Sequence, residues 1–372
     1  MNCSHVRFVG GGRWATIVLS ELTKTFPFIK IDWISNSNIN EKKELIRKSS
    51  RLKNVNVYPK ADLSKLHKPD KLIIASHSSQ HCLDLSIHKI TNVPVLIEKP
   101  IFPNYDDFES LPEEEKKNTF INLEFYNAYF ISDFSDKIPT SKIKDIKFTW
   151  HDPLTENRGK EESKNSEIYS SIFMDQLIHI MSISKFLNLK VENSIETKIE
   201  IDNSSEGVIK IFSTFGDVNV EISLSRFASK RERIIEINSG YMSLDYTSEP
   251  VIKKNNKILE KILPSDRLLP IAQTLSAFIN HSDDLNKPSL SLLSLMPEIN
   301  FCFKCEDIYA KHISDNLDLY SKETNKIVPN LIYYAGIMYY RKIKSLSSSS
   351  QIHFLKGDTG VKVLLDWWKA SI

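Results

Sequence analysis

The sequence contains little that would place the protein in a membrane, in an oxidising compartment or on a nucleic acid. None of its apolar runs approaches the roughly 20 residues of a membrane span, and its first residues show no signal-peptide pattern. Four cysteines in 372 residues are too few for a disulfide framework. The formal net charge of +2 provides no field that attracts nucleic acid or a membrane surface. We therefore expect a cytoplasmic protein that binds neither.

Two of the four cysteines, Cys302 and Cys305, form a single CxxC motif. The aromatic and aliphatic residues around them favour a buried helix, and no second cysteine pair or nearby histidine completes a zinc site. We interpret them as core residues and predict no metal site.

Glycine is also scarce, with ten residues, yet three of them are adjacent, directly after the apolar run Val6–Val9. The arrangement is Gly10-x-Gly12-x-x-Ala15, and a helix-like stretch follows. A strand, a glycine turn and a helix form the first half of a dinucleotide-binding unit, in which the pyrophosphate lies at the helix N-terminus. A glycine turn that opens a helix for structural reasons alone has the same pattern, so other signals must decide.

The first third of the chain alternates short apolar runs with helical stretches, which is typical of a doubly wound parallel α/β sheet. The predicted strands are 6–9, 31–34, 55–57, 71–75 and 95–97, with helices at 16–25, 41–49 and 82–90. From about residue 143 strands dominate, at 146–150, 191–201, 206–214, 218–225, 233–238 and 241–246, with helices at 170–187, 268–279 and 292–312.

This pattern predicts an N-terminal Rossmann domain over 1–120 and an α+β domain with a large, mainly antiparallel open sheet over 121–320. An aromatic-rich C-terminal extension occupies 321–372.

Two further signals follow predicted strands. Small polar residues from Ser76 to His81 follow the fourth strand, at the edge where open α/β sheets bind ligands, although a serine-rich helix cap has the same composition. Glu98-Lys99-Pro100 follows the fifth strand. A lysine there can bind the substrate oxygen beside a nicotinamide, or it can be a solvated strand end.

The fourth signal is the pair Asp175 and His179, four residues apart on one predicted helix face among apolar neighbours. An imidazole with an orienting carboxylate is a plausible general acid and base. An ordinary helix-stabilising pair has the same spacing.

Taken together, the order and spacing of these four signals resemble the Gfo/Idh/MocA oxidoreductases over about residues 5–315. By this resemblance Lys99 and His179 are catalytic, with Asp175 beside them in the substrate site. The resemblance and the second strand's end together assign the following residues to the cofactor: Gly10, Gly12, Arg13, Trp14, Ser35, Asn36, Ser76, His77, Ser78, His81, Glu98 and Lys99.

The sequence departs from the family pattern in three places. Ser170 and Ser171 stand where the family usually has a pair of glycines before the aspartate. His77 stands where a proline is common after the fourth strand. The chain beyond about residue 320 has no counterpart that we can place in the family core.

The resemblance implies an NAD(P)-dependent oxidoreductase that moves hydride between the nicotinamide and a carbonyl or carbinol carbon of a sugar, sugar nucleotide or related small molecule. Two alternatives stay open: an imine reductase of the thiazolinyl type, and a non-catalytic dinucleotide-binding regulator. The presence of Lys99, Asp175 and His179 together favours the dehydrogenase or reductase.

The expected cofactor is NADP, with NAD as the alternative. No acidic residue lies between Trp33 and Asn40, where one would bind the ribose 2′-hydroxyl, and Arg13 could pair with a 2′-phosphate.

We also expect a homodimer or homotetramer through the sheet of the second domain. The basis is a supposed apolar sheet face, which would be costly to leave in water. Its members would be Phe212, Val218, Val220 and Ile222.

Overall fold

The chain divides into two compact units, which are described in turn. A computed structural model describes residues 3–35, 38–77, 80–138, 143–157, 163–263, 268–280, 290–318, 328–342 and 357–371. Unit 1 comprises Met1–Phe102, Asp106–Tyr129 and Asp266–Met296, and unit 2 comprises Pro103–Tyr105, Phe130–Ser265 and Pro297–Ile372.

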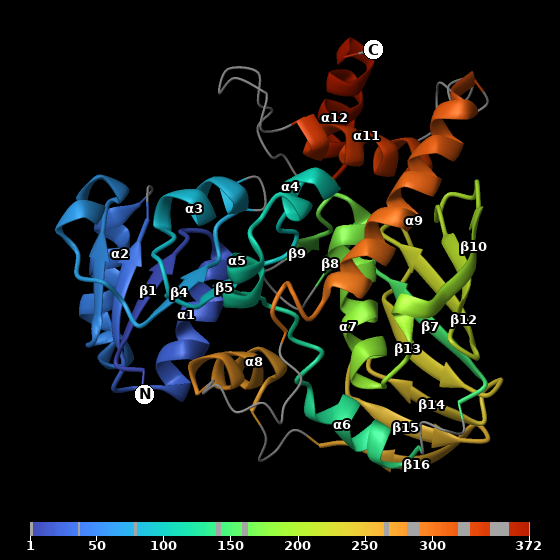
Figure 1. The fold of residues 1–372 in the computed structure, drawn as a ribbon, viewed down its shortest axis with the longest axis horizontal. Coiled ribbons are helices and arrows are strands. Elements are labelled where there is room, and N and C mark those ends of the chain that lie inside the picture. Colours follow the sequence, from blue (N-terminus) through green and yellow to red (C-terminus); the bar gives the residue numbers. More distant parts are fainter. Residues whose placement is uncertain are drawn as a thin grey trace. The chain divides into compact units, whose positions relative to one another are not determined.

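Unit 1 is built on a six-stranded parallel sheet with the order β3-β2-β1-β4-β5-β6. Its strands β1, β4 and β5 are labelled in Figure 1. Its strands are β1 (His5–Val9), β2 (Lys30–Ile34), β3 (Val55–Tyr58), β4 (Lys71–Ile74), β5 (Val95–Ile97) and β6 (Thr119–Ile121). The order reverses beside β1, so the carboxyl ends of β1 and β4 form the topological switch point at which such sheets bind ligands.

Helices and short helical turns connect these strands. They are α1 (Arg13–Thr25), α2 (Ile39–Lys48), η1 (Ser50–Leu52), η2 (Lys60–Lys65), α3 (His81–His88), α4 (Tyr105–Glu109) and α5 (Glu113–Asn118). A later helix, α8 (Pro270–Ile279), also belongs to unit 1. Leu19 and Leu22 of α1 pack with Phe8 and Trp33 of the sheet, and Leu275 of α8 joins the same buried cluster. A segment from late in the chain therefore completes the core of unit 1.

Unit 2 contains an eight-stranded, mostly antiparallel sheet with the order β10-β11-β12-β7-β13-β14-β15-β16. Its strands are β7 (Asp145–His151), β10 (Ser194–Ile201), β11 (Ile209–Phe215), β12 (Val218–Ser225), β13 (Glu232–Ile237), β14 (Met242–Asp245), β15 (Val251–Lys254) and β16 (Lys257–Lys261). A separate hairpin pairs β8 (Thr155–Asn157) with β9 (Ser163–Asn165). The pattern confirms the predicted fold class of a parallel Rossmann sheet and a large, mainly antiparallel open sheet.

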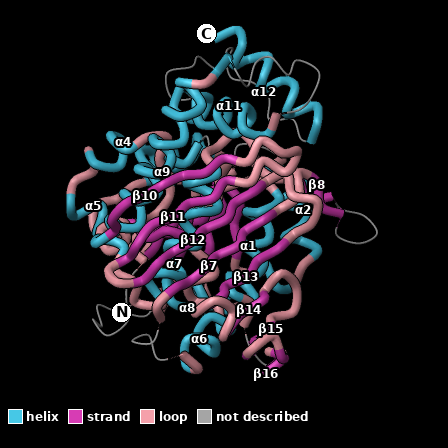
Figure 2. The backbone as a smooth tube through the Cα atoms, turned by 90° about the vertical axis from the view of Figure 1, so that its right-hand side faces the viewer, coloured by secondary structure: helices cyan, strands magenta, loops and turns pink. Residues whose placement is uncertain are grey.

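Helices cover one face of the large sheet and leave the other open. The helical elements of unit 2 are α6 (Tyr129–Asp136), the π-helical turn η5 (Phe173–Leu177), α7 (Ile178–Phe186), η6 (Val191–Asn193), α9 (Met296–Asp315), α11 (Pro329–Lys342) and α12 (Gly357–Ser371). Helices α7 and α9 lie against the covered face, where the Phe215 and Phe301 rings are 5.0 Å apart. Figure 2 shows the opposite face, over which no described helix lies.

The strand register corrects the predicted composition of this open face. Val220 and Ile222 pair with Ile146 and Phe148 of β7 and are 3% and 0% exposed, because they point toward the helices. The tight turn after Phe215 pairs it with Val218, so Val218 shares the covered face. Phe212 alone of the four lies on the open face.

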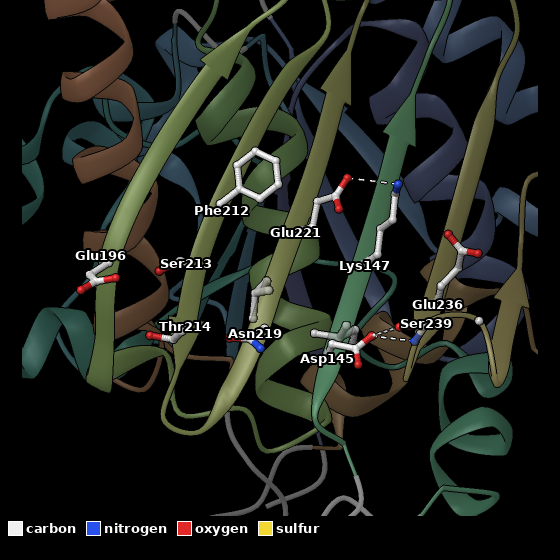
Figure 3. A pocket seen from close by; sticks show the side chains of 13 residues that line it. Asp145, Lys147, Glu196, Phe212, Ser213, Thr214, Asn219, Glu221, Glu236 and Ser239 are labelled. Carbon is white, nitrogen blue, oxygen red and sulfur yellow. Dashed lines mark hydrogen bonds and ion pairs between the residues drawn. The ribbon is translucent and has the colours of Figure 1, made fainter.

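The open face is polar. Lys147 forms an ion pair with Glu221 at 3.0 Å, and Asp145 accepts a hydrogen bond from the backbone of Ser239 at 2.6 Å (Figure 3). These residues line a hollow of about 510 Å³ on the sheet. Assembly through this face stays a prediction, but its supposed apolar basis was wrong.

Two searches cover the described residues alone. In that part of the chain, no helix combines the length and hydropathy needed to cross a membrane. The same residues include no group of three or more His, Cys, Asp or Glu side chains arranged to hold a metal ion. Cys302 and Cys305 are both buried in α9, and burial raises the pKa of both thiols.

We expect Gly10→Ala and Gly12→Ala to affect folding very differently. Gly10 has a φ of +142°, and an added Cβ would lie 2.5 Å from the carbonyl oxygen of Ala75, whereas a Cβ at Gly12 meets nothing within 4 Å. Gly10→Ala should therefore lower the free energy of unfolding by more than about 2 kcal/mol, and Gly12→Ala by less than about 1 kcal/mol. Urea denaturation followed by circular dichroism measures both; equal losses would contradict the close approach at Gly10.

Candidate functional site

The glycine turn after β1 forms an open cradle at the start of α1. Gly12 is the N-terminal cap of α1, and no side chain of the cap occupies the helix end. Gly10 packs directly on the end of β4, and its carbonyl accepts a hydrogen bond from Trp33 Nε1 at 2.6 Å. The exposed N-terminus of α1 offers unsatisfied N–H groups and a positive dipole end, which favour a pyrophosphate.

The end of β2 lacks an acidic side chain that could bind a ribose. Ser35 is buried, and its backbone N–H donates to the Tyr58 carbonyl. Asn36 lies outside the described residues. The nearby Asp32 is 2% exposed and binds His5 Nε2 at 2.8 Å within the unit. Arg13, at the first position of α1, is exposed.

The loop after β4 is tied to the loop after β5 by a buried histidine. His81 Nδ1 lies 2.6 Å from the Pro100 carbonyl oxygen, and its Nε2 lies 2.9 Å from that of Ser76. Burial lowers the pKa of His81 to about 4, against the opposing effect of the two carbonyl acceptors, which favour a ring with N–H groups on both nitrogens. His81 therefore lies behind the loops and holds them together, whereas His77 is exposed. Ser78 lies outside the described residues.

Glu98 connects the third signal with the glycine turn. The carboxylate is 6% exposed and accepts hydrogen bonds from Asn122 and from the Trp14 side chain. Burial raises the pKa of Glu98 to about 7, against the opposing effect of these two donors and of Lys99. Lys99 itself is half-buried.

The described members of the predicted cofactor set thus meet at the carboxyl edge of the unit 1 sheet. Gly10 contacts the end of β4, Trp14 binds Glu98, and His81 joins the two following loops. The Ser76 hydroxyl is buried and has no hydrogen-bond partner among the described residues. The space around Gly12, where an added Cβ would meet nothing within 4 Å, and an unsatisfied hydroxyl at the same edge fit a dinucleotide.

In unit 2, Ser171 begins the helix that carries the other candidate residues. Its hydroxyl accepts hydrogen bonds from the backbone N–H groups of Phe173 and Met174, at 3.2 and 3.4 Å, in the manner of a helix N-cap. Ser171 therefore has a local structural role as a helix cap. The following turn is π-helical, because the Ile178 N–H reaches back to the Phe173 carbonyl. Such π-turns are frequent at functional sites.

Asp175 lies in this π-turn and is held by Arg226. The Arg226 Nη2 atom is 2.8 Å from Asp175 Oδ2, and the same guanidinium donates to the carbonyls of Ser170 and Ser171 at 2.8 and 3.2 Å. Arg226 is 1% exposed, whereas the Asp175 side chain is 15% exposed. Arg226 thus fixes the Asp175 carboxylate, which is partly exposed beside the buried guanidinium.

His179 lies in α7 and stacks on Trp150 of β7. The two rings are 5.2 Å apart and inclined by 4°, and His179 is 4% exposed. The Arg233 guanidinium lies 4.1 Å from the Trp150 ring and also pairs with Asp152 at 3.1 Å. Asp152 accepts a hydrogen bond from Trp150 Nε1 as well. Trp150 is held by Arg233 and Asp152, and its indole therefore fixes the orientation of the His179 ring.

Four supporting residues were missed by sequence reasoning: Trp150, Asp152, Arg226 and Arg233. Each lies in or just after a strand; Trp150 is 29 positions from His179 and Arg226 is 51 positions from Asp175, so no local spacing links them. The only signal was indirect, since charged residues interrupt the apolar pattern at the ends of β12 and β13.

Comparisons with known proteins find similarity in structure only. No family model and no curated protein matches the sequence. A Gfo/Idh/MocA family oxidoreductase from Vibrio cholerae matches with a TM-score of 0.62 at 11% identity, over 83% of this chain and 99% of the other. UDP-N-acetylglucosamine 3-dehydrogenase from Acidithiobacillus ferrooxidans matches with a TM-score of 0.60 at 12% identity, over 82% and 97%.

A third solved structure contains a bound cofactor. KijD10, a 3-ketoreductase from Actinomadura kijaniata in complex with TDP-benzene and NADP, matches with a TM-score of 0.59 at 14% identity, over 80% of this chain and 95% of the other. These likenesses show that the chain has the fold of the Gfo/Idh/MocA oxidoreductases, which confirms the fold implied by the sequence resemblance. About a fifth of the chain lies outside each match.

We expect Glu98→Gln to reduce the pH dependence of stability. The folded-state pKa near 7 lies above the ordinary value of 4.5, so the native state binds more protons than the unfolded chain between these values. The contribution of Glu98 to stability is therefore fully present below about pH 4.5 and is lost as pH rises through 7, by about 3 kcal/mol.

Glu98→Gln should accordingly match the wild type near pH 4.5 and exceed its stability at pH 8. Thermal unfolding at a series of pH values measures this, with the exposed Glu113→Gln as the control. Parallel curves for wild type and Glu98→Gln would contradict the raised pKa.

Proposed function

We propose that the protein is a nicotinamide-dependent oxidoreductase that transfers hydride between the nicotinamide and a carbonyl or carbinol carbon of a sugar, sugar nucleotide or related polar molecule. The observation that carries the proposal is the arrangement around Glu98. A buried carboxyl group accepts a hydrogen bond from Trp14 of the glycine turn and immediately precedes Lys99, the candidate for the reacting oxygen. The fold likeness to a UDP-N-acetylglucosamine 3-dehydrogenase and to a 3-ketoreductase in complex with TDP-benzene and NADP supports the substrate class.

The proposed roles in unit 1 follow from the chemistry of its residues. A bound nicotinamide supplies or accepts the hydride. The turn at Gly10 and Gly12, with the N-terminus of α1, binds the pyrophosphate, and the Ser76 hydroxyl provides an unsatisfied polar group at the same edge. Lys99 donates a hydrogen bond to the substrate oxygen and so stabilises the negative charge that develops there.

The proposed roles in unit 2 concern the proton. His179 gives a proton to the substrate oxygen during reduction and takes it back during oxidation. Its stacking on Trp150 fixes the ring plane, which reduces the entropy lost on reaching the reactive geometry. Asp175, fixed by Arg226, presents a carboxylate to the substrate. Cytoplasmic location and assembly through the open sheet remain predictions.

The test of the proposed function is NADPH and NADH oxidation with a panel of keto sugars, sugar nucleotides and cyclic imines. Turnover with a keto sugar or sugar nucleotide supports the proposal. Turnover with imines only would overturn the substrate class. Cofactor binding without turnover across the panel would favour a regulatory protein instead.

Lys99→Ala and His179→Ala should each lower kcat by about 10²- to 10⁴-fold, the usual contribution of a general acid or base. Both variants should bind the reduced cofactor within a few-fold of the wild type, because neither residue is assigned to the pyrophosphate. Steady-state kinetics and cofactor fluorescence titration measure the two effects. Near-normal kcat in either variant would remove that residue from the mechanism.

The proposed cofactor is NADP, because the end of β2 offers no described acidic side chain and Arg13 is exposed at the start of α1. NADPH should bind more tightly than NADH in a fluorescence titration. Arg13→Ala should weaken NADPH alone, because a 2′-phosphate is the only group that distinguishes the two cofactors. Equal weakening of both would assign Arg13 to the pyrophosphate, and tighter binding of NADH by the wild type would make NAD the cofactor.

A further inference from the structure

The C-terminal helix α11 packs directly on the segment that leads into the Asp175 helix. A Cβ placed on Gly336 would lie 2.4 Å from the Ile168 carbonyl oxygen and 3.4 Å from that of Ser170. Only glycine, which has no Cβ, allows the backbone of α11 to approach the segment from Ile168 to Ser170 this closely. The carbonyl of Ser170 is also one of the acceptors of Arg226.

Tyr333, one turn before Gly336, binds the backbone of Arg226. Its hydroxyl oxygen accepts a hydrogen bond from the Arg226 N–H at 2.7 Å, and its ring lies 5.6 Å from that of Phe227. Tyr333 is 1% exposed, and burial raises the pKa of its hydroxyl to about 12. The hydroxyl is therefore a permanent, neutral partner for Arg226 at any working pH.

A second contact joins the same helix to the N-cap of the Asp175 helix. Arg341 Nε donates to Glu306 of α9 at 2.8 Å, and the buried Glu306 carboxylate is hydrogen-bonded to the Ser171 side chain. Ser171 is the residue whose hydroxyl caps this helix. Two routes thus lead from α11 to the start of the helix, one through Arg226 and one through Glu306.

We propose that Tyr333 and Arg226 are positioning residues, through which helix α11 fixes the Asp175 carboxylate for the reaction. The proposal rests on the proposed function in one respect, that Asp175 belongs to the substrate site. The Arg226 guanidinium donates to three oxygens at once, and its planar fork keeps all three contacts when the backbone that carries it is held in position. The Tyr333 hydroxyl defines that position.

Tyr333→Phe is the informative variant, since it keeps the buried ring and removes only the hydroxyl. We expect kcat to fall about tenfold, the equivalent of one net hydrogen bond, while KM for the reduced cofactor stays unchanged. The matched control is Tyr334→Phe on the same helix, whose ring packs on Trp368 and whose kcat should match the wild type.

A double-mutant cycle with Asp175→Asn separates positioning from general stabilisation. If Tyr333 acts through Asp175, Tyr333→Phe should have little further effect on kcat in the Asp175→Asn background. A full tenfold loss in that background would overturn the proposal, and so would an unchanged kcat in Tyr333→Phe alone.

Hydrogen exchange followed by mass spectrometry keeps this test separate from the proposed function. Amides of residues 173–178 should exchange faster in Tyr333→Phe than in the wild type or in Tyr334→Phe. Hydrogen exchange needs no substrate, so it stays a valid test even if the wild type turns over none of the keto sugars, sugar nucleotides or imines. That lack of turnover would count against the proposed function only. Equal exchange in all three proteins would overturn the positioning role of Tyr333.

Discussion

The buried guanidinium of Arg226 is the interaction on which unit 2 depends most. It is 1% exposed and donates to two backbone carbonyls and one carboxylate, while its own backbone N–H is bound by Tyr333. Desolvating a charge so completely is favourable only when every partner is in place, and removal of one leaves a buried charge uncompensated. The end of β12 and the π-helical turn must therefore assemble together around this cation, and α11 adds the Tyr333 hydroxyl, which binds the Arg226 backbone.

In unit 1, close packing of the backbone, and not a buried charge, fixes the conformation of the glycine turn. The glycine turn rests on the end of β4 so closely that no side chain fits at Gly10, and Trp33 closes the turn from behind. Few charged side chains are needed to shape this cradle. The two units thus illustrate two ways of fixing groups for chemistry: steric exclusion at Gly10 in unit 1, and a buried, hydrogen-bonded charge at Arg226 in unit 2.

Local patterns predicted the elements of the parallel sheet well, because its buried strands are short apolar runs and glycines mark the turn. They missed α5, whose residues Glu113–Asn118 are all polar, and they placed Val220 and Ile222 on the wrong face, since alternation shows which residues of a strand share a face but not which face is covered. Neither Arg226 nor Trp150 could be assigned beside Asp175 and His179. Their contacts join a strand to a helix between residues far apart in the chain, and a single sequence does not show which distant residues come together in space.

The late position of α8 and α11 in the chain has a consequence for biosynthesis. Unit 1 lacks part of its core until Pro270–Ile279 has left the ribosome, and the Arg226 backbone lacks its Tyr333 partner until Pro329–Lys342 has followed. Because chains emerge from the N-terminus at about 5–20 residues per second, the Rossmann strands wait for many seconds with apolar surface uncovered. During this interval the nascent chain is a natural client for chaperones, although its N-terminal strands look ready to fold at once.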